Sequence, residues 1–553
     1  MAEDGERAGA ADAMVDRELV QPLSETSGVL APDGLLQQEL LSEAAVDVAE
    51  RAPGSAGVEP GLGTKVRRGA VWSAGSVVVM RFANIALMAV VARLVAPAEF
   101  GLFTVALTVH AFVTSVAELG VASAVARSDL DIDRIAPTVA TISIVTSFTL
   151  GALMFGFAQN LADLMGSPDA AAPLRVLSLT VVMIGPFAVP GAQLQREFRQ
   201  QRLFLASVVS FVVSSGVLMV LALNSDGAMA FAWSRVVGTA ITGWFLVTGV
   251  SKHYWPGFRR SEVSPLLRFG LPLAGANLLS QLLLNVDYVF VSRISGAAKL
   301  GLYTLAFNIA SWPTAVIGSM LNGVVLPAFS AVKQTDGALG PAMHKATRSV
   351  LAVAAPIGFT TLALATPLVA TVYGAKWLDA APVLQILSLY GVIFVTCVLF
   401  ANIIIAMGRT GVLMIVQVVA LAALVPTIAL GLHRLGLVGV GVAHIVVICA
   451  VTLPTYLVAV RRTTRATPLL LARAAGPPVL AAAVAALAAA AVSSLTSAAP
   501  LQLVTGGVAA VAVYGLLMLP FLEELAPPAL LRVPVAARLV HLGSSVRSRL
   551  SAP

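Results

Sequence analysis

Charge is scarce in this sequence. Only 11% of the 553 residues are Asp, Glu, Lys or Arg, whereas 58% are hydrophobic and the mean hydropathy is +0.90. A soluble globular domain carries about 25% charged residues. The composition therefore excludes a soluble globular protein, because apolar segments of this extent need lipid as their solvent.

Cysteine and catalytic motifs are also missing or rare. Cys397 and Cys449 both lie inside apolar segments, so we expect two buried small side chains rather than a disulfide or a metal pair. The chain lacks HExxH, CxxC and GxSxG motifs and a glycine-rich phosphate loop. The sequence predicts no enzyme, no cofactor, no metal site and no nucleic-acid partner.

The first 64 residues lack aromatic side chains and hold 13 Asp or Glu against three Arg. This composition predicts an acidic, disordered tail. Within it, residues 35–50 are either solvated like the rest or form an amphipathic helix on a partner. No signal-peptide pattern precedes the first apolar segment, so we expect that segment to stay in the mature protein.

Long apolar segments dominate the rest of the chain. A transmembrane helix needs about 20 apolar residues, and the pattern predicts an all-α polytopic membrane protein with about fourteen spans. The predicted spans cover residues 70–95, 100–126, 135–159, 172–193, 203–223, 227–250, 266–291, 300–328, 347–373, 381–406, 411–432, 436–460, 474–494 and 501–522.

Lys and Arg are unequally shared between the two sides of these spans. If the N-terminus is cytoplasmic, 24 lie in cytoplasmic segments and six on the outer side. The bias predicts that both termini are cytoplasmic. Arg outnumbers Lys 29 to 6 beside heavy use of Ala and Val, which is typical of a GC-rich bacterial genome and indicates a bacterial plasma membrane.

The chain also contains an internal repeat. Residues 92–106 (ARLVAPAEFGLFTVA) and 292–306 (SRISGAAKLGLYTLA) align at an offset of 200 residues. Each copy joins two apolar segments, and Arg93 and Arg293 both fall on the predicted outer side. The repeat predicts two six-helix lobes of the same topology, as in transporters that rock around a central site. The predicted domains are the tail 1–64, an N-lobe 65–262, a C-lobe 263–465, and a helix pair with a basic tail, 466–553.

Several short motifs occur in a familiar order. They are KVRRGAVWS at 65–73, PAEFG at 97–101, PGAQLQREFR at 190–199 and RFGLP at 268–272. With them, residues 65–465 resemble the oligosaccharide flippases of the multidrug/oligosaccharidyl-lipid/polysaccharide exporter superfamily. The element at 190–199 is similar to the LLQR-x-x-x-F element of its capsule and exopolysaccharide subgroup. The resemblance implies a transporter that moves polyprenyl-pyrophosphate-linked sugar units from the cytoplasmic to the outer leaflet.

Three readings remain open. Besides that flippase, the chain fits a lipid II flippase or a cation-coupled multidrug exporter of the same superfamily, or a membrane enzyme of polysaccharide assembly. The short outer connections, such as 160–171 and 292–300, count against the enzyme, and the two extra spans and the deep arginines favour anionic cargo. The candidate partners are a lipid-linked oligosaccharide, membrane lipid, H⁺ or Na⁺, and a polysaccharide polymerase or glycosyltransferases.

Polar residues inside spans are the candidate cargo-binding groups, because such residues are costly in lipid and usually face a cavity or a partner. Arg81 and Asn84 lie in the first span and His110 in the second. An arginine at this depth suits a pyrophosphate, since its guanidinium binds phosphate oxygens in pairs. Alternatively, Arg81 ties helices together and His110 is a packed core histidine.

Other candidates follow further along the chain. Arg235 either lines the cavity or extends toward the outer surface. In the seventh span Asn277, Gln281 and Asn285 form a stripe at intervals of four residues, with Asn308 in the eighth span a possible counterpart. This stripe either binds sugar hydroxyls or holds helices together.

Two carboxylates and two arginines complete the set. Glu118 and Asp287 lie deep in spans and are the candidate sites for a coupling ion, unless Glu118 pairs with Arg81 or a basic loop. Arg93 and Arg293 lie at equivalent outer ends, where they either cap helix C-termini or form an outer gate.

Overall fold

The computed structural model describes residues 83–117, 132–197, 199–224, 227–312, 314, 339–407, 410–464 and 466–521. All regular secondary structure in these ranges is helical, because a backbone in lipid must satisfy its hydrogen bonds within its own segment. Eleven of the described helices are long and apolar enough to cross a membrane. The all-α membrane architecture is therefore confirmed, whereas the count of fourteen spans stays a prediction.

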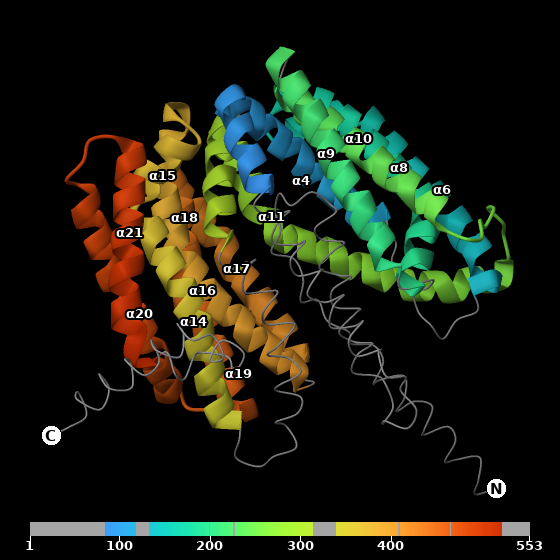
Figure 1. Cartoon of the computed structure of the whole chain (residues 1–553). Helices are drawn as coiled ribbons and strands as arrows, with labels where there is room; N and C mark the ends of the chain where they lie inside the picture. The colour runs from blue at the N-terminus through green and yellow to red at the C-terminus, as the bar shows by residue number, and fades with distance from the viewer. Residues whose placement is uncertain are drawn as a thin grey trace, which may run out of the picture.

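Two groups of helices make up the molecule (Figure 1). The first group contains the helix Ala83–Leu94, α4 (Pro97–Ala117), α6 (Ile132–Gly156), α7 (Ala158–Leu164), η1 (Pro168–Ala170), α8 (Ala171–Arg196), α9 (Gln200–Asn224) and α10 (Gly227–Gly249). The second group contains α14 (Leu339–Ala363), α15 (Ala365–Val372), η3 (Ala375–Ala380), α16 (Ala381–Ala406), α17 (Thr410–Leu435), α18 (Leu437–Val447), η4 (Ile448–Thr452) and α19 (Leu453–Thr464). The second group is flanked, on the side that faces away from the first group, by α20 (Pro468–Ser493), α21 (Ala499–Met518) and η5 (Leu519–Phe521).

The helix α11 (Arg260–Ala310) connects the two groups. It is broken at Gly296, whose positive φ of 80° interrupts the helical backbone. The part before the break has 36 residues and is about 54 Å long, well beyond the ~30 Å hydrocarbon core of a bilayer. In Figure 1 this part runs below the first group toward the middle of the molecule, where the second part stands beside α4.

Several predicted boundaries need correction. The predicted ninth span, 347–373, is two helices, because the chain leaves α14 at Ala363 and begins α15 at Ala365. The predicted outer connection 160–171 is mostly helical, since α7 and η1 occupy it. Apolar composition alone does not mark the break between α14 and α15, because the residues on both sides of it are apolar.

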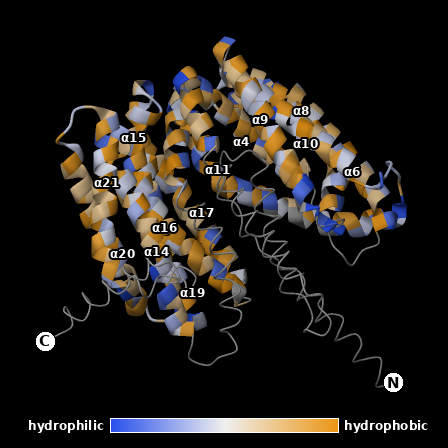
Figure 2. Ribbon diagram, in the orientation of Figure 1, coloured by the Kyte–Doolittle hydropathy of each residue, from blue (hydrophilic) through white to orange (hydrophobic). Residues whose placement is uncertain are grey.

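The two groups meet at their upper ends in Figure 1 and diverge toward the lower ends. The largest apolar cluster joins them there, with Val91 and Leu174 from the first group, Leu300 from α11, and Trp377 and Leu384 from the second. Figure 2 shows apolar residues along the helices and hydrophilic residues gathered at their ends. The upper end carries Arg93 and Arg293, so the charge bias makes it the predicted outer end.

Candidate functional site

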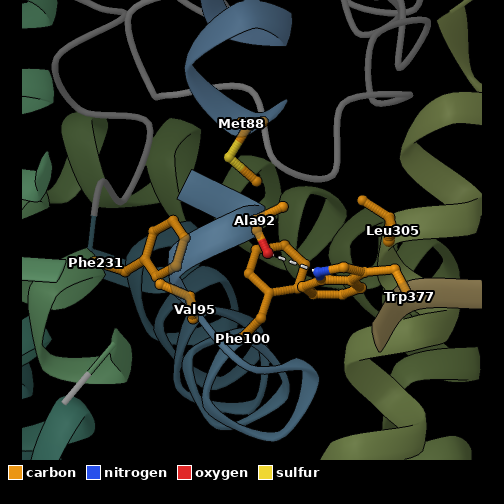
Figure 3. A pocket seen from close by; sticks show the side chains of 7 residues that line it. All are labelled: Met88, Ala92, Val95, Phe100, Phe231, Leu305 and Trp377. Carbon is orange, nitrogen blue, oxygen red and sulfur yellow. Dashed lines mark hydrogen bonds between the residues drawn. The ribbon is translucent and has the colours of Figure 1, made fainter. Parts of the chain in front are cut away.

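Trp377 joins the two groups at the predicted outer end. It lies in η3 of the second group, and its indole N–H donates a 2.7 Å hydrogen bond to the Ala92 carbonyl of the first. Its ring meets the edge of Phe100 at 5.8 Å, and its side chain is only 1% exposed (Figure 3). A tryptophan that is buried with its polar atom satisfied makes a stable contact between packed surfaces.

Aromatic and aliphatic side chains surround this contact. Phe231 of α10 packs on Phe100 at 5.5 Å and stacks on Phe103 at 4.9 Å. The outer seal, as we call it, consists of Met88, Ala92, Val95, Phe100, Phe231, Leu305 and Trp377. The space left between them is about 10 Å³, which is at or below the about 10–15 Å³ needed by one water molecule. The side chains of the seal therefore leave no room for a water molecule between them.

Two arginines cross between the groups beside the outer seal. Arg93 of the first group donates to the carbonyls of Thr371 and Val372 at the end of α15. Arg293 of α11 donates a 2.7 Å bond to the carbonyl of Leu164, the last residue of α7. The capping prediction is confirmed, because each arginine donates to the last carbonyls of a short helix, where a cation is favourable. Neither arginine caps its own helix, and the outer gate stays a prediction.

The capped helices are themselves equivalent. α7 directly follows the long helix α6 and α15 directly follows the long helix α14, and each short helix is followed by a glycine with positive φ, Gly166 at 72° and Gly374 at 98°. Such a glycine ends a helix without steric cost and leaves the last carbonyls available to a donor. Further bonds strengthen both sides, with Ser292 donating to Met165 O at 2.7 Å and Lys376 to Arg93 O at 3.0 Å.

The two copies of the repeat cross at matched glycines. A Cβ atom on Gly101 would collide with the Ala297 carbonyl, and one on Gly301 would collide with the Pro97 carbonyl. The two contacts are related by the same 200-residue offset as the repeat. Small residues allow helices in membranes to approach this closely. We call the first group the first half, and α11 together with the second group the second half. The repeat is then the interface between the two halves at the predicted outer end.

A buried polar cluster lies within the second half. Tyr303 donates a 2.6 Å hydrogen bond to Asp287 Oδ2, and its hydroxyl lies 3.1 Å from His444 Nε2. His444 Nε2 is also 3.5 Å from Asp287 Oδ2. We call Asp287, Tyr303 and His444 the polar cluster. Its members come from both parts of α11 and from α18.

Rings and backbone fix the polar cluster in place. The Tyr390 ring of α16 stacks on the His444 ring at 5.0 Å, and the Tyr288 ring meets the Tyr303 ring edge-on at 5.8 Å. The backbone N–H of Tyr288 donates to Asp287 Oδ1 at 3.0 Å. A carboxyl, a phenol and an imidazole in contact can exchange a proton or supply ligands to a small cation.

A sequence profile for polysaccharide biosynthesis proteins matches residues 90–382, just over half of the chain. The chain belongs to this family. The matched range includes both copies of the repeat, every residue of the outer seal except Met88, and the Asp287 and Tyr303 members of the polar cluster. The family resemblance drawn from the short motifs is thereby confirmed.

Two curated relatives show what members of the family are named for. The lipopolysaccharide biosynthesis protein WzxC of Escherichia coli (strain K12) is 25% identical over 411 residues, which cover 72% of this chain and 82% of the relative. The succinoglycan biosynthesis transport protein ExoT of Rhizobium meliloti (strain 1021) is 28% identical over 330 residues, covering 59% of this chain and 66% of the relative.

The fold also matches a solved transporter. The inward closed conformation of the lipid II flippase MurJ aligns with a TM-score of 0.63 at 15% identity, over 81% of this chain and 98% of that one. At this identity the likeness establishes the fold of this family member and no more.

The predicted binding residues of the first half are only partly described. Arg81 and Glu118 lie outside the described residues. His110 is buried, and its Nε2 lies 2.7 Å from Thr180 Oγ1 on α8, which is the contact expected of a packed histidine. Asn84 and Arg235 are half-buried. Their role in binding stays a prediction.

Two members of the predicted polar stripe on α11, Gln281 and Asn285, contact each other. Asn285 is buried and donates to the Gln281 carbonyl at 2.8 Å and to Gln281 Oε1 at 3.2 Å, whereas Asn277 is half-buried. Asn308 on the second part of α11 is half-buried as well. These contacts join the Asn285 side chain to Gln281 of the same helix, and cargo binding by the stripe stays a prediction.

Three residues of the outer seal and the polar cluster escaped the sequence reasoning, namely Tyr303, Trp377 and His444. The repeat contained a signal for one of them, because Phe103 in the first copy becomes Tyr303 in the second and so adds a hydroxyl at an apolar position. For Trp377 and His444 the sequence offers no such comparison, since both lie outside the aligned segments.

The cysteine prediction was half right. Cys397 is buried and Cys449 is exposed, and both are free thiols. Cys449 lies in the π-helical turn η4, on the outside of the helix rather than in the core. In a membrane protein, an apolar segment does not show which side chains are buried in the protein, because apolar side chains can also face lipid. The described residues contain no group of three or more metal-binding side chains.

Proposed function

We propose that this protein flips polyprenyl-pyrophosphate-linked oligosaccharide units from the cytoplasmic to the outer leaflet of the bacterial plasma membrane during cell-surface polysaccharide biosynthesis. The family membership, the two relatives named for polysaccharide biosynthesis and transport, and the transporter fold support the proposal. The protein acts as a carrier and catalyses no reaction of its own.

The observation that carries the mechanism is the pairing of the two halves at the outer end. Arg93 and Arg293 each cap a helix of the opposite half, and Gly101 and Gly301 cross at matched positions. Matched contacts of this kind can break at the same time when two related halves rock, because each half presents the same elements to the other. The structure is then the state closed to the outside, which receives cargo from the cytoplasm.

The polar cluster is the proposed coupling site. Cargo movement against a gradient needs an ion that binds differently in the two states. Asp287 and Tyr303 lie on the two parts of α11, which meet at Gly296 beside the crossing of the halves. A proton or Na⁺ bound at Asp287 would therefore change contacts between elements that move. Glu118 and Arg81 remain proposed partners in coupling and phosphate binding.

The proposed topology completes the account. Residues 65–262 and 263–465 form the two lobes, both termini are cytoplasmic, and the tail 1–64 lies outside the membrane. A polymerase at the outer surface would receive the flipped unit, and glycosyltransferases at the inner surface would supply it.

The function is tested by complementation of a bacterial strain that lacks its own repeat-unit flippase. Expression of the wild-type chain should restore surface polysaccharide and remove lipid-linked units that accumulate inside. Arg81→Ala should abolish this export while the protein level in the membrane is unchanged, because the pyrophosphate loses its cationic partner. Lys299→Ala, at the predicted outer surface, is the control and should export normally.

Two results would argue against the proposal. Normal export by Arg81→Ala would remove the phosphate site. Rescue of a strain that lacks its lipid II flippase, without rescue of the polysaccharide strain, would assign the chain to peptidoglycan synthesis instead.

A further inference from the structure

Each member of the polar cluster lies close to an interruption of its helix. Asp287 comes before Gly296, where α11 is broken, and Tyr303 comes after it. His444 lies one helical turn before Ile448, the first residue of the π-helical turn η4. Single π-helical turns inside α-helices occur frequently at functional sites, and they and glycines are places where helices bend. A change in the hydrogen bonds of the cluster would therefore act beside two points at which helices can change direction.

The carboxyl group of Asp287 is buried without a lysine or arginine. Its side chain is only 2% exposed, and among the described residues its one ion-pair partner is His444. The other titratable groups around it are the phenols of Tyr288 and Tyr390 and the thiol of Cys397, none of which carries positive charge. A buried charge that lacks an opposite charge is costly. The cluster therefore favours the uptake of one positive charge, either a proton or a metal ion.

The spacing of the cluster does not suit a metal ion. The Tyr303 hydroxyl lies 2.6 Å from Asp287 Oδ2 and 3.1 Å from His444 Nε2. These are distances of atoms that share a proton, and a cation between them would have to push them apart. Asp287 Oδ1 already accepts the backbone N–H of Tyr288 at 3.0 Å. Hard cations are bound through oxygen, whereas one of the three groups here is a nitrogen. The geometry therefore favours a proton.

Tyr303 links the other two groups into a chain of hydrogen bonds. A phenol can donate one proton and accept another. Its hydroxyl donates to Asp287 Oδ2, so its oxygen can accept from His444 Nε2 when that nitrogen carries the imidazole proton. The same distances fit the reverse order, in which Asp287 donates to Tyr303, Tyr303 donates to His444 Nε2, and Nδ1 carries the imidazole proton. The reverse order holds one proton more, because its carboxyl group is neutral.

We propose that the coupling ion of this protein is a proton, which Tyr303 relays between His444 and Asp287. The proposal rests on the coupling role given to the polar cluster under the proposed function, and it names the ion and the path. His444 is the entry, because it is 6% exposed whereas Asp287 is 2% and Tyr303 0% exposed.

The relay conserves every bond but one. A proton from water adds to His444 Nδ1, and the Nε2 proton moves to the Tyr303 oxygen. The former hydroxyl proton of Tyr303 moves to Asp287 Oδ2. One N–H bond thus forms and one breaks on the imidazole, one O–H bond forms and one breaks on the phenol, and the carboxyl group gains an O–H bond. The cluster changes from one negative charge to none, and release reverses these steps.

Infrared difference spectroscopy of the full-length protein in lipid tests the proposal without cargo and without a gradient. A step from high to low pH in Na⁺-free buffer should produce the band of a protonated carboxyl group in an apolar environment. Asp287→Asn should lack this band. Asp379→Asn, at an exposed carboxyl group in η3, is the matched control and should keep it. Addition of Na⁺ at constant pH should leave the wild-type band unchanged.

The relay itself is tested by the rate at which the band appears after a light-induced pH jump. His444→Gln keeps a polar side chain but cannot pass a proton on, so the band should appear about 100-fold more slowly, as expected for the loss of a positioned proton-transfer group. His433→Gln, exposed near the end of α17, is the control and should keep the wild-type rate.

Three results would overturn the proposal. They are a wild-type band that Na⁺ removes at constant pH, a band that persists in Asp287→Asn, and equal rates in His444→Gln and His433→Gln. The Na⁺ measurement needs no variant, so it decides the ion even where a substitution prevents folding. None of these results bears on the flippase proposal, which the complementation experiment tests separately.

Discussion

Two pairs of residues that differ at the 200-residue offset of the repeat, one just before the aligned segments and one within them, supply two members of the polar cluster. Leu87 corresponds to Asp287 and Phe103 to Tyr303, each pair being 200 residues apart. In the first half the apolar partners pack in or against the cluster of the outer seal. In the second half the polar partners bind each other at 2.6 Å. A matched loss of symmetry at two neighbouring positions indicates that the second half performs a task that the first does not.

Tyr303→Phe tests whether this task is the proposed ion coupling. The change removes the hydroxyl that donates to Asp287 and contacts His444, and it should lower the free energy of unfolding by about 1–2 kcal/mol. It should also make flipping in proteoliposomes less dependent on an imposed proton or sodium gradient, because the carboxyl loses its fixed geometry. Asp287→Asn should remove the dependence altogether.

Tyr514→Phe is the matched control for that prediction. Its hydroxyl donates a 2.7 Å bond to the Ala352 carbonyl, far from the polar cluster. This variant should lose stability by about 0.5–1.5 kcal/mol and keep the gradient dependence of the wild type. If Tyr303→Phe and Asp287→Asn behave like Tyr514→Phe in the flipping assay, the cluster has only a structural role.

The sequence predicted one residue of this cluster and missed its partners for a physical reason. Asp287 can be recognised from the sequence as a candidate functional residue, because a carboxylate in an apolar segment is energetically costly whichever way the helix is rotated. Tyr303 and His444 are ordinary residues of apolar helices, and their meeting with Asp287 depends on how α11 and α18 rotate against each other. That rotation is set by tertiary packing, which no helical periodicity encodes.

At the scale of elements, the outer ends of the helices make the contacts between the halves. The sequence placed Arg93 and Arg293 at equivalent outer positions and expected helix capping. It did not reveal that each arginine reaches the short helix of the opposite half, because α7 and α15 were hidden in a predicted connection and in a predicted single span. The repeat therefore predicted that the two arginines occupy equivalent positions, whereas the positions of the short helices α7 and α15 decide which carbonyls the arginines bind.

The glycine crossing leads to a prediction for these elements. Gly101→Val and Gly301→Val should each force the two halves apart at the outer end, since the new side chain would occupy the position of a backbone carbonyl. A membrane-impermeant thiol reagent should then label a cysteine introduced at Ala92 at least several-fold faster than in the wild-type background. Cys449 needs replacement by Ser beforehand, because it is exposed.

Gly216→Ala provides the control for that labelling experiment. A Cβ at this position in α9 meets no atom within 4 Å, so the change should leave labelling unaltered and stabilise the helix by up to about 1 kcal/mol. Unchanged labelling in Gly101→Val and Gly301→Val would mean that the crossing does not hold the outer end closed.

At the scale of the whole molecule, the apolar pattern and the repeat predicted the architecture well. The helical membrane fold and the family follow from composition, periodicity and motif order, because lipid permits few backbone structures. The closed state does not follow from them. It depends on contacts between residues far apart in the chain: Trp377 with Ala92 and Arg93 with Val372 are 285 and 279 positions apart, and Arg293 with Leu164 is 129 positions apart.

The central claim is that the outer end opens and closes while lipid-linked sugar crosses the membrane. The most direct test links Arg93→Cys to Thr371→Cys with a short thiol crosslinker in a Cys397→Ser, Cys449→Ser background. Flipping of a fluorescent polyprenyl-pyrophosphate-linked oligosaccharide is then measured in proteoliposomes. The account predicts that the crosslinked protein stops flipping and that cleavage of the linker restores the rate. Flipping at the same rate with the outer end crosslinked would contradict it.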